Sequence, residues 1–338
     1  MKAVVLERPG KFSLMDLDAP QEPRAGEALV CVRKVGICGT DLHAFHGDQP
    51  FFQYPRILGH ELAVEVAAIG PNEEGLKAGD RCAVEPYLHC GSCIACRTGK
   101  TNCCVNLKCL GVHTDGGMQD RMILPAAKLH RSDILSLDQL ALVETLGIGA
   151  HAVERSSLTP RETVLVIGAG PIGLSVVEFA RQKNTQVIVM DVTQARLDFC
   201  GRILGVEHCI HGKENPLGQL QEILGGELPT AVFDCTGSAE SMLKAFEYVA
   251  HSGKLVFVGL FSGNVTFHDP TFHSRELTLL SSRNATGKEQ QRVIKLMEAG
   301  KIDIAPWITH RLPSTSIAEN LFQWMSAPSA GIKTLVDW

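Results

Sequence analysis

The sequence predicts a two-domain α/β protein, with one β-rich domain and one domain built on a doubly wound parallel sheet. The chain has 338 residues, more than a single hydrophobic core usually supports. Short apolar runs punctuated by glycine and proline fill roughly the first 150 residues, whereas strand and helix patterns alternate after Pro160. We therefore expect residues 1–149 and 283–338 to form one domain and residues 150–282 to form the other.

The N-terminal elements are expected to be strands. Apolar runs at 28–32, 63–69 and 81–84 have the length and residue types of strands in a barrel or sandwich. Near the C-terminal end, a helical pattern covers 289–299 and a strand-like run covers 333–336. We expect this last segment to rejoin the first domain.

The middle of the chain is expected to form a six-stranded sheet with helices on both faces, because its hydrophobic period switches repeatedly between that of a strand and that of a helix. Five of these strands can be placed, at 163–167, 186–191, 231–234, 254–259 and 276–281, and the expected helices include 171–183, 194–204 and 241–250.

Composition narrows the class of function. The chain is 45% hydrophobic and 20% charged with a net charge of −5, so it offers no overall basic surface for nucleic acid or anionic membrane. The N-terminus, MKAVVLERPG, carries charges and a proline instead of an apolar signal sequence, and no apolar run reaches membrane-spanning length. We expect a cytoplasmic protein that acts on a small molecule, with neither nucleic acid nor membrane as a partner.

Four of the twelve cysteines follow the spacing C-x2-C-x2-C-x7-C. Disulfides are rare in the cytoplasm, so clustered thiols there indicate a metal site. Four thiolates on one short loop can fill all positions around a tetrahedral zinc, which is typical of a structural site. The predicted ligands are Cys90, Cys93, Cys96 and Cys104. A zinc ribbon that binds nucleic acid is the rival interpretation, and the acidic net charge disfavours it.

A second group of metal-binding residues lies upstream. Cys38 stands in G-I-C-G-T-D-L-H, and His60 and Glu61 stand in L-G-H-E. A thiolate, an imidazole and a carboxylate suit a zinc that keeps one position open for chemistry. Each residue alone would more often be a buried core residue, but together they predict a catalytic metal site. The other seven cysteines are expected mostly to be small core residues: Cys31, Cys82, Cys103, Cys109, Cys200, Cys209 and Cys235.

A glycine-rich turn follows the predicted strand 163–167 and precedes a predicted helix. This context is typical of a dinucleotide-binding turn, where glycines let the backbone approach a pyrophosphate and the helix offers its N-terminal N–H groups. The turn consists of Gly168, Gly170, Pro171, Ile172 and Gly173. Asp191 ends the next strand, where a carboxylate binds ribose hydroxyls and repels a 2′-phosphate, so we expect NAD rather than NADP. Arg196 could also pair with the cofactor.

The ordered motifs G-I-C-G-T-D-L-H, G-H-E, the four-cysteine loop, A-L-V-E-T-L, G-A-G-P-I-G and F-V-G-L resemble the zinc-dependent medium-chain alcohol and polyol dehydrogenases over essentially the whole chain. The resemblance implies a GroES-like catalytic domain, a Rossmann domain, and two zinc ions per subunit, one catalytic and one structural. Within the family the chain is similar to the sorbitol and threonine dehydrogenase branch. The segments G-D-Q-P-F-F-Q-Y-P-R-I-L-G-H-E and G-V-H-T-D-G-G are similar to dehydrogenases of sugar acids of the L-galactonate and L-gulonate type.

The resemblance also implies roles for individual residues. Thr40 would take the proton of the substrate hydroxyl and pass it by way of the nicotinamide ribose to His43, and Asp41 would orient His60 by accepting its distal N–H. Glu61 and Glu144 are alternative fourth ligands of the catalytic zinc. Further cofactor contacts are implied at Thr236, Val258, Gly259, Leu260, Ser282 and Asn284.

The substrate is the least defined part of the sequence prediction. Phe45 and Glu144 match pocket positions in the polyol branch, and Arg283 matches an arginine that faces substrate and cofactor. An arginine there could bind the carboxylate of a sugar acid, although it could equally be a surface residue. Oxidation of a secondary hydroxyl of a sugar acid is the leading expectation, with a polyol or L-threonine 3-dehydrogenase as the alternative. The resemblance implies a homodimer or a homotetramer.

Overall fold

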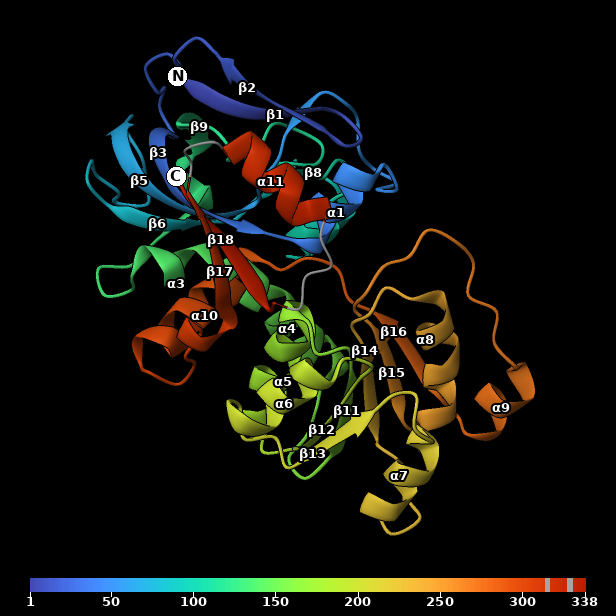
Figure 1. Ribbon diagram of the computed structural model, residues 1–338. Coiled ribbons are helices and arrows are strands. Elements are labelled where there is room, and N and C mark those ends of the chain that lie inside the picture. Colours follow the sequence, from blue (N-terminus) through green and yellow to red (C-terminus); the bar gives the residue numbers. More distant parts are fainter. Residues whose placement is uncertain (314–316, 327–330) are drawn as a thin grey trace. The chain divides into compact units, whose positions relative to one another are not determined.

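The structure is a computed structural model and describes residues 1–313, 317–326 and 331–338. The chain divides into two compact units (Figure 1). Unit 1 comprises Met1–Glu144 and Ala285–Trp338, and unit 2 comprises Thr145–Asn284. Unit 1 is β-rich and unit 2 is a parallel α/β sheet, so the expected fold class is confirmed.

Unit 1 contains a mostly antiparallel sheet with the strand order β10-β6-β5-β3-β18-β17, in which β9 also pairs with β3. Long strand β3 pairs with β5 on one side and with the C-terminal strand β18 on the other (Figure 1). The sheet thus joins the two ends of the chain, as the strand-like run at 333–336 led us to expect. Its strands are β3 (Glu27–Ile37), β5 (Glu61–Ile69), β6 (Arg81–Val84), β9 (Arg121–Pro125), β10 (Leu129–Arg131), β17 (Ile308–Pro313) and β18 (Lys333–Asp337).

Smaller elements complete unit 1. A three-stranded sheet has the order β2-β1-β4, and β7 pairs with β8 in a two-stranded sheet. These strands are β1 (Lys2–Arg8), β2 (Lys11–Asp16), β4 (Arg56–Ile57), β7 (Tyr87–Leu88) and β8 (Lys108–Cys109). The helices are α1 (Gly39–His46), α2 (Ile94–Arg97), α3 (Leu137–Ala141), α10 (Gly287–Glu298), α11 (Ile317–Ser326), and the short 3-10 turns η1 (Thr101–Cys103), η2 (Ala126–Lys128) and η4 (Ala305–Trp307).

Unit 2 is a parallel sheet with the strand order β13-β12-β11-β14-β15-β16. The order reverses between β11 and β14, which is the point where doubly wound sheets bind their ligands, outside the carboxyl ends of the strands. The strands are β11 (Thr163–Ile167), β12 (Gln186–Asp191), β13 (His208–His211), β14 (Ala231–Asp234), β15 (Lys254–Phe257) and β16 (Thr278–Ser281).

Helices cover both faces of the unit 2 sheet because both faces are apolar. On one face of the sheet, Leu165 and Ile188 form a buried cluster with Leu220 of α7. Val166, the next residue of β11, points to the opposite face, where Gly173 of α5 approaches it. The helices are α5 (Pro171–Arg181), α6 (Gln194–Arg202), α7 (Pro216–Ile223), α8 (Ala239–Lys244), η3 (Ala245–Tyr248) and α9 (Asp269–Ser274), with α4 (Val143–Ser156) leading in from unit 1. Among the described residues, none of the helices has the length and hydrophobicity needed to cross a bilayer.

Two elements of unit 2 differ from the sequence-based expectation. Strand β13 is the sixth strand of the sheet, whose position the sequence did not reveal, because its sequence H-C-I-H lacks an apolar run and only Ile210 is fully buried. The helix expected over 241–250 is instead a short α-helix followed by the 3-10 turn η3.

Candidate active site

Cys38, His60 and Glu61 come together in unit 1. One ligand atom from each residue lies within 4.8 Å of the others. Cys38 is the N-cap of α1, directly after β3, and Glu61 is the first residue of β5. Because β3 and β5 are paired neighbours, the end of one strand and the start of the other bring these side chains to the same place.

Gly36 makes room for the Glu61 carboxylate. The two residues are opposite each other in the β3–β5 ladder. A Cβ atom on Gly36 would lie 2.0 Å from Oε2 of Glu61, a distance at which something must shift. The absence of a side chain at residue 36 is therefore part of how this site is built; Gly36 opens the motif G-I-C-G-T-D-L-H, but the sequence analysis gave it no role of its own.

Lys333 is a site residue that the sequence analysis missed. Its Nζ donates to Oε1 of Glu61, and both side chains are almost fully buried. Strand β18 brings Lys333 to the site by pairing with β3, where Thr334 lies opposite Ile37. Burial works to lower the pKa of Lys333, but the neighbouring Glu61 and Cys38 raise it above its usual value, so the lysine stays charged.

Asp41 lies in the first turn of α1, next to Cys38 and His60. Its Oδ2 accepts the backbone N–H of Cys38 at 2.9 Å. Its Oδ1 is 3.8 Å from Nδ1 of His60, which is longer than a hydrogen bond. Asp41 thus faces the ring nitrogen that it is expected to orient. Burial opposes protonation of His60, yet the charges of Cys38 and Asp41 hold its pKa well above the ordinary value.

The donor set fits a bound metal ion. Three buried atoms in the cluster have no hydrogen-bond partner among the described residues, namely Oδ1 of Asp41, Nδ1 of His60 and Oε2 of Glu61. Several acidic groups with one buried lysine leave negative charge that is costly without a cation. A thiolate, an imidazole and a carboxylate are ligands that zinc accepts.

Glu144 lies at the start of α4 and is buried close to the cluster. The hydroxyl of Tyr87 donates a hydrogen bond to Oε1 of Glu144. Burial raises the pKa of Glu144, which also interacts electrostatically with His60 and Glu61. Cys109 is buried here too, and burial raises its pKa to about 12. The charge of His60 opposes this rise in pKa, whereas the charge of Glu144 adds to it. Cys109 is thus a buried residue, as expected, and also a neighbour of the metal cluster.

Helix α1 carries the expected proton-relay residues. Thr40 and His43 are three residues apart, so they share one side of the helix. Nδ1 of His43 is 3.0 Å from Oδ1 of Asp48, and the side chain is 60% exposed. Phe45 behaves differently, because it is buried in the core of unit 1 and stacks on Phe12. The structure does not bring Phe45 to the cluster, and its contact with substrate stays a prediction.

The four thiols of the cysteine loop are gathered around one point, within 4.8 Å of one another. The Cys93 and Cys96 sulfurs are 3.5 Å apart, as are those of Cys90 and Cys104. Four sulfurs at tetrahedral corners around zinc would be separated by roughly 3.8 Å, given a Zn–S bond of about 2.3 Å. The loop therefore fits a zinc ion whose ligands all come from the protein.

Two thiols of this loop differ in pKa. Backbone N–H groups of Ser92 and Cys93 lower the pKa of Cys90 to about 5. Burial and the neighbouring Cys93 thiol raise the pKa of Cys96 to about 12. In the metal-free chain the loop thus holds both thiolate and thiol, and metal binding would displace the remaining protons.

In unit 2 the glycine-rich turn has the geometry of a dinucleotide-binding turn. Gly168 follows β11 with φ of +95°, and Gly170 is the N-cap of α5. A Cβ atom on Gly173 would lie 1.7 Å from the carbonyl oxygen of Gly168. Pro171 is the first residue of α5 and Ile172 the second. Glycine is thus required where the strand, turn and helix meet, and the helix N-terminus stays open to an anionic ligand.

Asp191 reaches this turn from the end of β12. Its Oδ2 accepts the N–H of Ala169 at 2.6 Å, and its Oδ1 accepts that of Thr193 at 2.8 Å. Nη1 of Arg196 is 4.0 Å from Asp191. The carboxylate is therefore fixed at the edge of the turn, where the sequence led us to expect it.

The other expected cofactor residues also lie at the carboxyl edge of the unit 2 sheet. The hydroxyl of Thr236 donates to Asp234 at 2.7 Å, after β14. A Cβ atom on Gly168 would lie 3.0 Å from Cγ2 of Thr236, which places this residue beside the turn. The remaining cofactor residues follow β15 or β16: Val258, Gly259, Leu260, Ser282 and Asn284. Arg283, expected to face the substrate, also follows β16.

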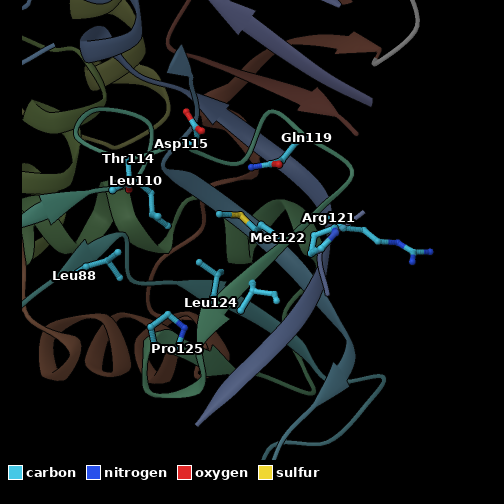
Figure 2. A pocket seen from close by; sticks show the side chains of 11 residues that line it. Leu88, Leu110, Thr114, Asp115, Gln119, Arg121, Met122, Leu124 and Pro125 are labelled. Carbon is cyan, nitrogen blue, oxygen red and sulfur yellow. The ribbon is translucent and has the colours of Figure 1, made fainter. Parts of the chain in front are cut away.

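Figure 2 shows a separate open groove of about 340 Å³ in unit 1. Leu88, Leu110, Met122 and Leu124 contribute apolar side chains to it. Successive residues of a strand point to opposite faces, so Leu88 of β7 faces the groove while Tyr87 faces Glu144. The residues that line the groove are not those of the metal cluster.

Comparisons with known proteins show which family the chain belongs to. Residues 24–134 match the alcohol dehydrogenase GroES-like domain, and residues 171–299 match the zinc-binding dehydrogenase family. The chain belongs to the zinc-type alcohol dehydrogenase family, and the expected family is confirmed.

Two relatives and one crystal structure show which dehydrogenases of this family the chain is similar to. The chain is 40% identical over 319 residues to the L-galactonate-5-dehydrogenase of Escherichia coli, covering 94% of both proteins. It is 30% identical over 343 residues to the L-threonine 3-dehydrogenase of Pyrococcus horikoshii, covering 98% of this chain and 97% of the other. The crystal structure of the E. coli alcohol dehydrogenase RspB with NADH superposes with a TM-score of 0.91 at 30% identity, covering 100% of this chain and 99% of the other.

Proposed function

We propose that the protein oxidises a secondary hydroxyl of a sugar acid of the L-galactonate or L-gulonate type to a ketone, with hydride transfer to NAD+. The observation that carries this proposal is the cluster of Cys38, His60 and Glu61, in which buried atoms of His60 and Glu61 have no hydrogen-bond partner among the described residues. The 40% identity to an L-galactonate-5-dehydrogenase supports the substrate class.

Zinc held by Cys38, His60 and either Glu61 or Glu144 would supply a Lewis acid that lowers the pKa of the substrate hydroxyl. Glu61 has one oxygen bound to Lys333 and the other unpartnered within the described chain, so it can turn one oxygen toward an ion. Glu144 is held by Tyr87 nearby. Either carboxylate can therefore complete the ligand set.

The proton released from the substrate would pass along α1. The hydroxyl of Thr40 could accept the substrate proton and donate its own proton onward. With the cofactor bound, its ribose would connect Thr40 to the imidazole of His43. The exposed ring of His43 can exchange that proton with water, and Asp48 fixes its Nδ1 side. The protein groups of this relay all come from α1 and the turn that follows it.

NAD is the proposed cofactor, because Asp191 stands at the edge of the glycine turn, where a 2′-phosphate would be repelled. The NADH complex of RspB supports this choice. Arg283, in the turn after β16, is the proposed partner for the substrate carboxylate, since a guanidinium can bind a carboxylate through two parallel hydrogen bonds. We further propose a cytoplasmic homodimer or homotetramer.

A polyol or L-threonine 3-dehydrogenase is the second candidate. It is favoured by the 30% identity to the P. horikoshii enzyme over nearly the whole chain. Both candidates use the same metal cluster and cofactor turn, so only the substrate separates them.

The test is NADH formation by the zinc-loaded protein at roughly pH 8 to 9, a range that favours ionisation of the hydroxyl. The substrates are L-galactonate, L-gulonate, other aldonates, sorbitol, galactitol and L-threonine, with NAD+ and NADP+ in parallel, before and after chelation. Chelator-sensitive turnover of an aldonate with NAD+ is the expected result. Turnover confined to neutral polyols or L-threonine would replace the sugar-acid proposal with the second candidate, and turnover that survives complete zinc removal would contradict both.

A further inference from the structure

The cysteine loop is anchored to the protein by the two-stranded sheet of β7 and β8. In this sheet Tyr87 pairs with Cys109 and Leu88 pairs with Lys108. The loop with the four thiols leaves the sheet after Leu88 and returns at Lys108. The N–H of Leu110 donates to the carbonyl of Pro86 at 3.0 Å, which closes the base of the loop.

Both residues of the first pair in this base face the catalytic cluster. Tyr87 is 3% exposed and donates its hydroxyl to Glu144, which is 4% exposed. Cys109 interacts electrostatically with His60. Tyr87 is three residues before Cys90, the first thiol of the loop. A change in the loop can therefore reach the cluster through one short segment that is paired to β8.

We propose that Tyr87 is a positioning residue that couples the cysteine loop to the catalytic metal site by holding the carboxylate of Glu144. The inference rests on the proposed function only in requiring a metal at Cys38, His60 and Glu61; it does not depend on the substrate. A buried carboxylate that loses its hydrogen bond costs free energy, so it would rotate to form a contact with another group. When the phenol is lost or displaced, Glu144 is free to turn toward the metal or away from it, and metal retention changes.

The experiment uses protein with Co2+ in the catalytic site and zinc in the loop. Two readouts are measured without substrate: the visible spectrum of the Co2+, which reports its ligands, and the rate at which a chelator removes it. Tyr87→Phe keeps the ring and removes the hydroxyl. We expect it to shift the Co2+ bands and to change the release rate by about tenfold, the size of one buried hydrogen bond. Tyr248→Phe, which removes a phenol hydroxyl in unit 2, should leave both readouts unchanged.

Two double-variant comparisons test the coupling. If Tyr87 acts through Glu144, Tyr87→Phe adds nothing to Glu144→Gln. If Tyr87 carries the influence of the loop, Cys96→Ser, which removes one loop ligand, changes Co2+ release in the Tyr87 protein but not in the Tyr87→Phe protein. Should Cys96→Ser not fold, the first comparison decides alone, because it leaves the loop intact.

An unchanged spectrum and release rate in Tyr87→Phe would overturn the inference, as would additive effects with Glu144→Gln. Either result would leave the proposed function standing, since that is judged by turnover of the wild-type protein. Conversely, failure of every sugar acid to react would not affect the Co2+ measurements.

Discussion

The two candidate metal sites of unit 1 are built in opposite ways. The cysteine loop gathers four thiols from one short segment, and Cys90 is exposed. The catalytic cluster instead takes Cys38, His60 and Glu61 from the ends of two strands and buries a counter-ion, Lys333, from a third. The first site can form locally, whereas the second needs the folded sheet. We therefore expect substitutions in the cysteine loop to lower stability first, and substitutions in the catalytic cluster to lower turnover first.

The largest expected difference concerns single thiols. Cys38→Ala should lower kcat/KM by at least about a thousandfold, because a catalytic metal supplies several kcal/mol of transition-state stabilisation. Its circular dichroism and melting temperature should stay near those of the wild type. Cys93→Ala should lower the melting temperature first, because a structural zinc contributes directly to folding. Cys31→Ala, at a thiol in β3 outside both sites, is the control. Equal losses of folding in both variants would remove the distinction between the two sites.

The next effect concerns the buried counter-ion. Lys333→Met should lower the free energy of unfolding by about 3–5 kcal/mol, because it leaves the Glu61 carboxylate buried without its partner. Lys34→Met removes an ion pair with Asp337 that is nearer the surface, and should cost less than about 1 kcal/mol. Denaturant unfolding measures both changes. Equal, small losses would mean that water replaces the lysine at Glu61.

A smaller effect is expected at Gly36. Gly36→Ala forces the Glu61 carboxylate to move and should cost about 1–3 kcal/mol, the usual cost of overpacking. It should also weaken zinc retention, measured by equilibrium dialysis against a chelator. Gly39→Ala is the matched control, because a Cβ atom there meets nothing within 4 Å. If the two variants retain zinc equally, the space beside Gly36 is not needed for the metal site.

The smallest effect is a difference in thiol reactivity in the metal-free protein. Because the pKa of Cys90 is lowered to about 5, its thiolate predominates above that pH and is lost as the pH falls through it. At pH 6 iodoacetamide should alkylate Cys90 about tenfold faster than an unperturbed thiol, since more thiolate outweighs its weaker nucleophilicity. Peptide mapping by mass spectrometry would show this, with exposed Cys103 as the reference. Zinc should protect Cys90, and a rate independent of pH between 4 and 7 would contradict the lowered pKa.

The sequence was sufficient for what is encoded locally. The strands at 163–167, 186–191 and 231–234 coincide with β11, β12 and β14, because each is a continuous apolar run between polar turns. The gathering of the four loop thiols also followed from spacing alone. In contrast, β13 has only one fully buried residue and gave no strand signal.

The sequence did not indicate which distant side chains the pairing of strands brings to the candidate metal site. Lys333 stands in an ordinary strand pattern, and nothing in its neighbours indicates a partner at Glu61. Tyr87 and Cys109 belong to strands of two residues, too short for any periodic signal. Phe45 matches a pocket position of the polyol branch; α1 places it against Phe12 in the core, and its contact with substrate stays a prediction.

The ion pair between Glu61 and Lys333 spans 272 residues of the chain. At roughly 5–20 residues per second, a ribosome would need roughly 15 to 55 s to synthesise that stretch. During this time the emerging strands β3 and β5 carry a carboxylate that has no lysine to neutralise it. The candidate metal site of unit 1 would therefore be completed as one of the last steps of biosynthesis, and a chain that stops before β18 would carry the candidate zinc ligands without the lysine that neutralises Glu61.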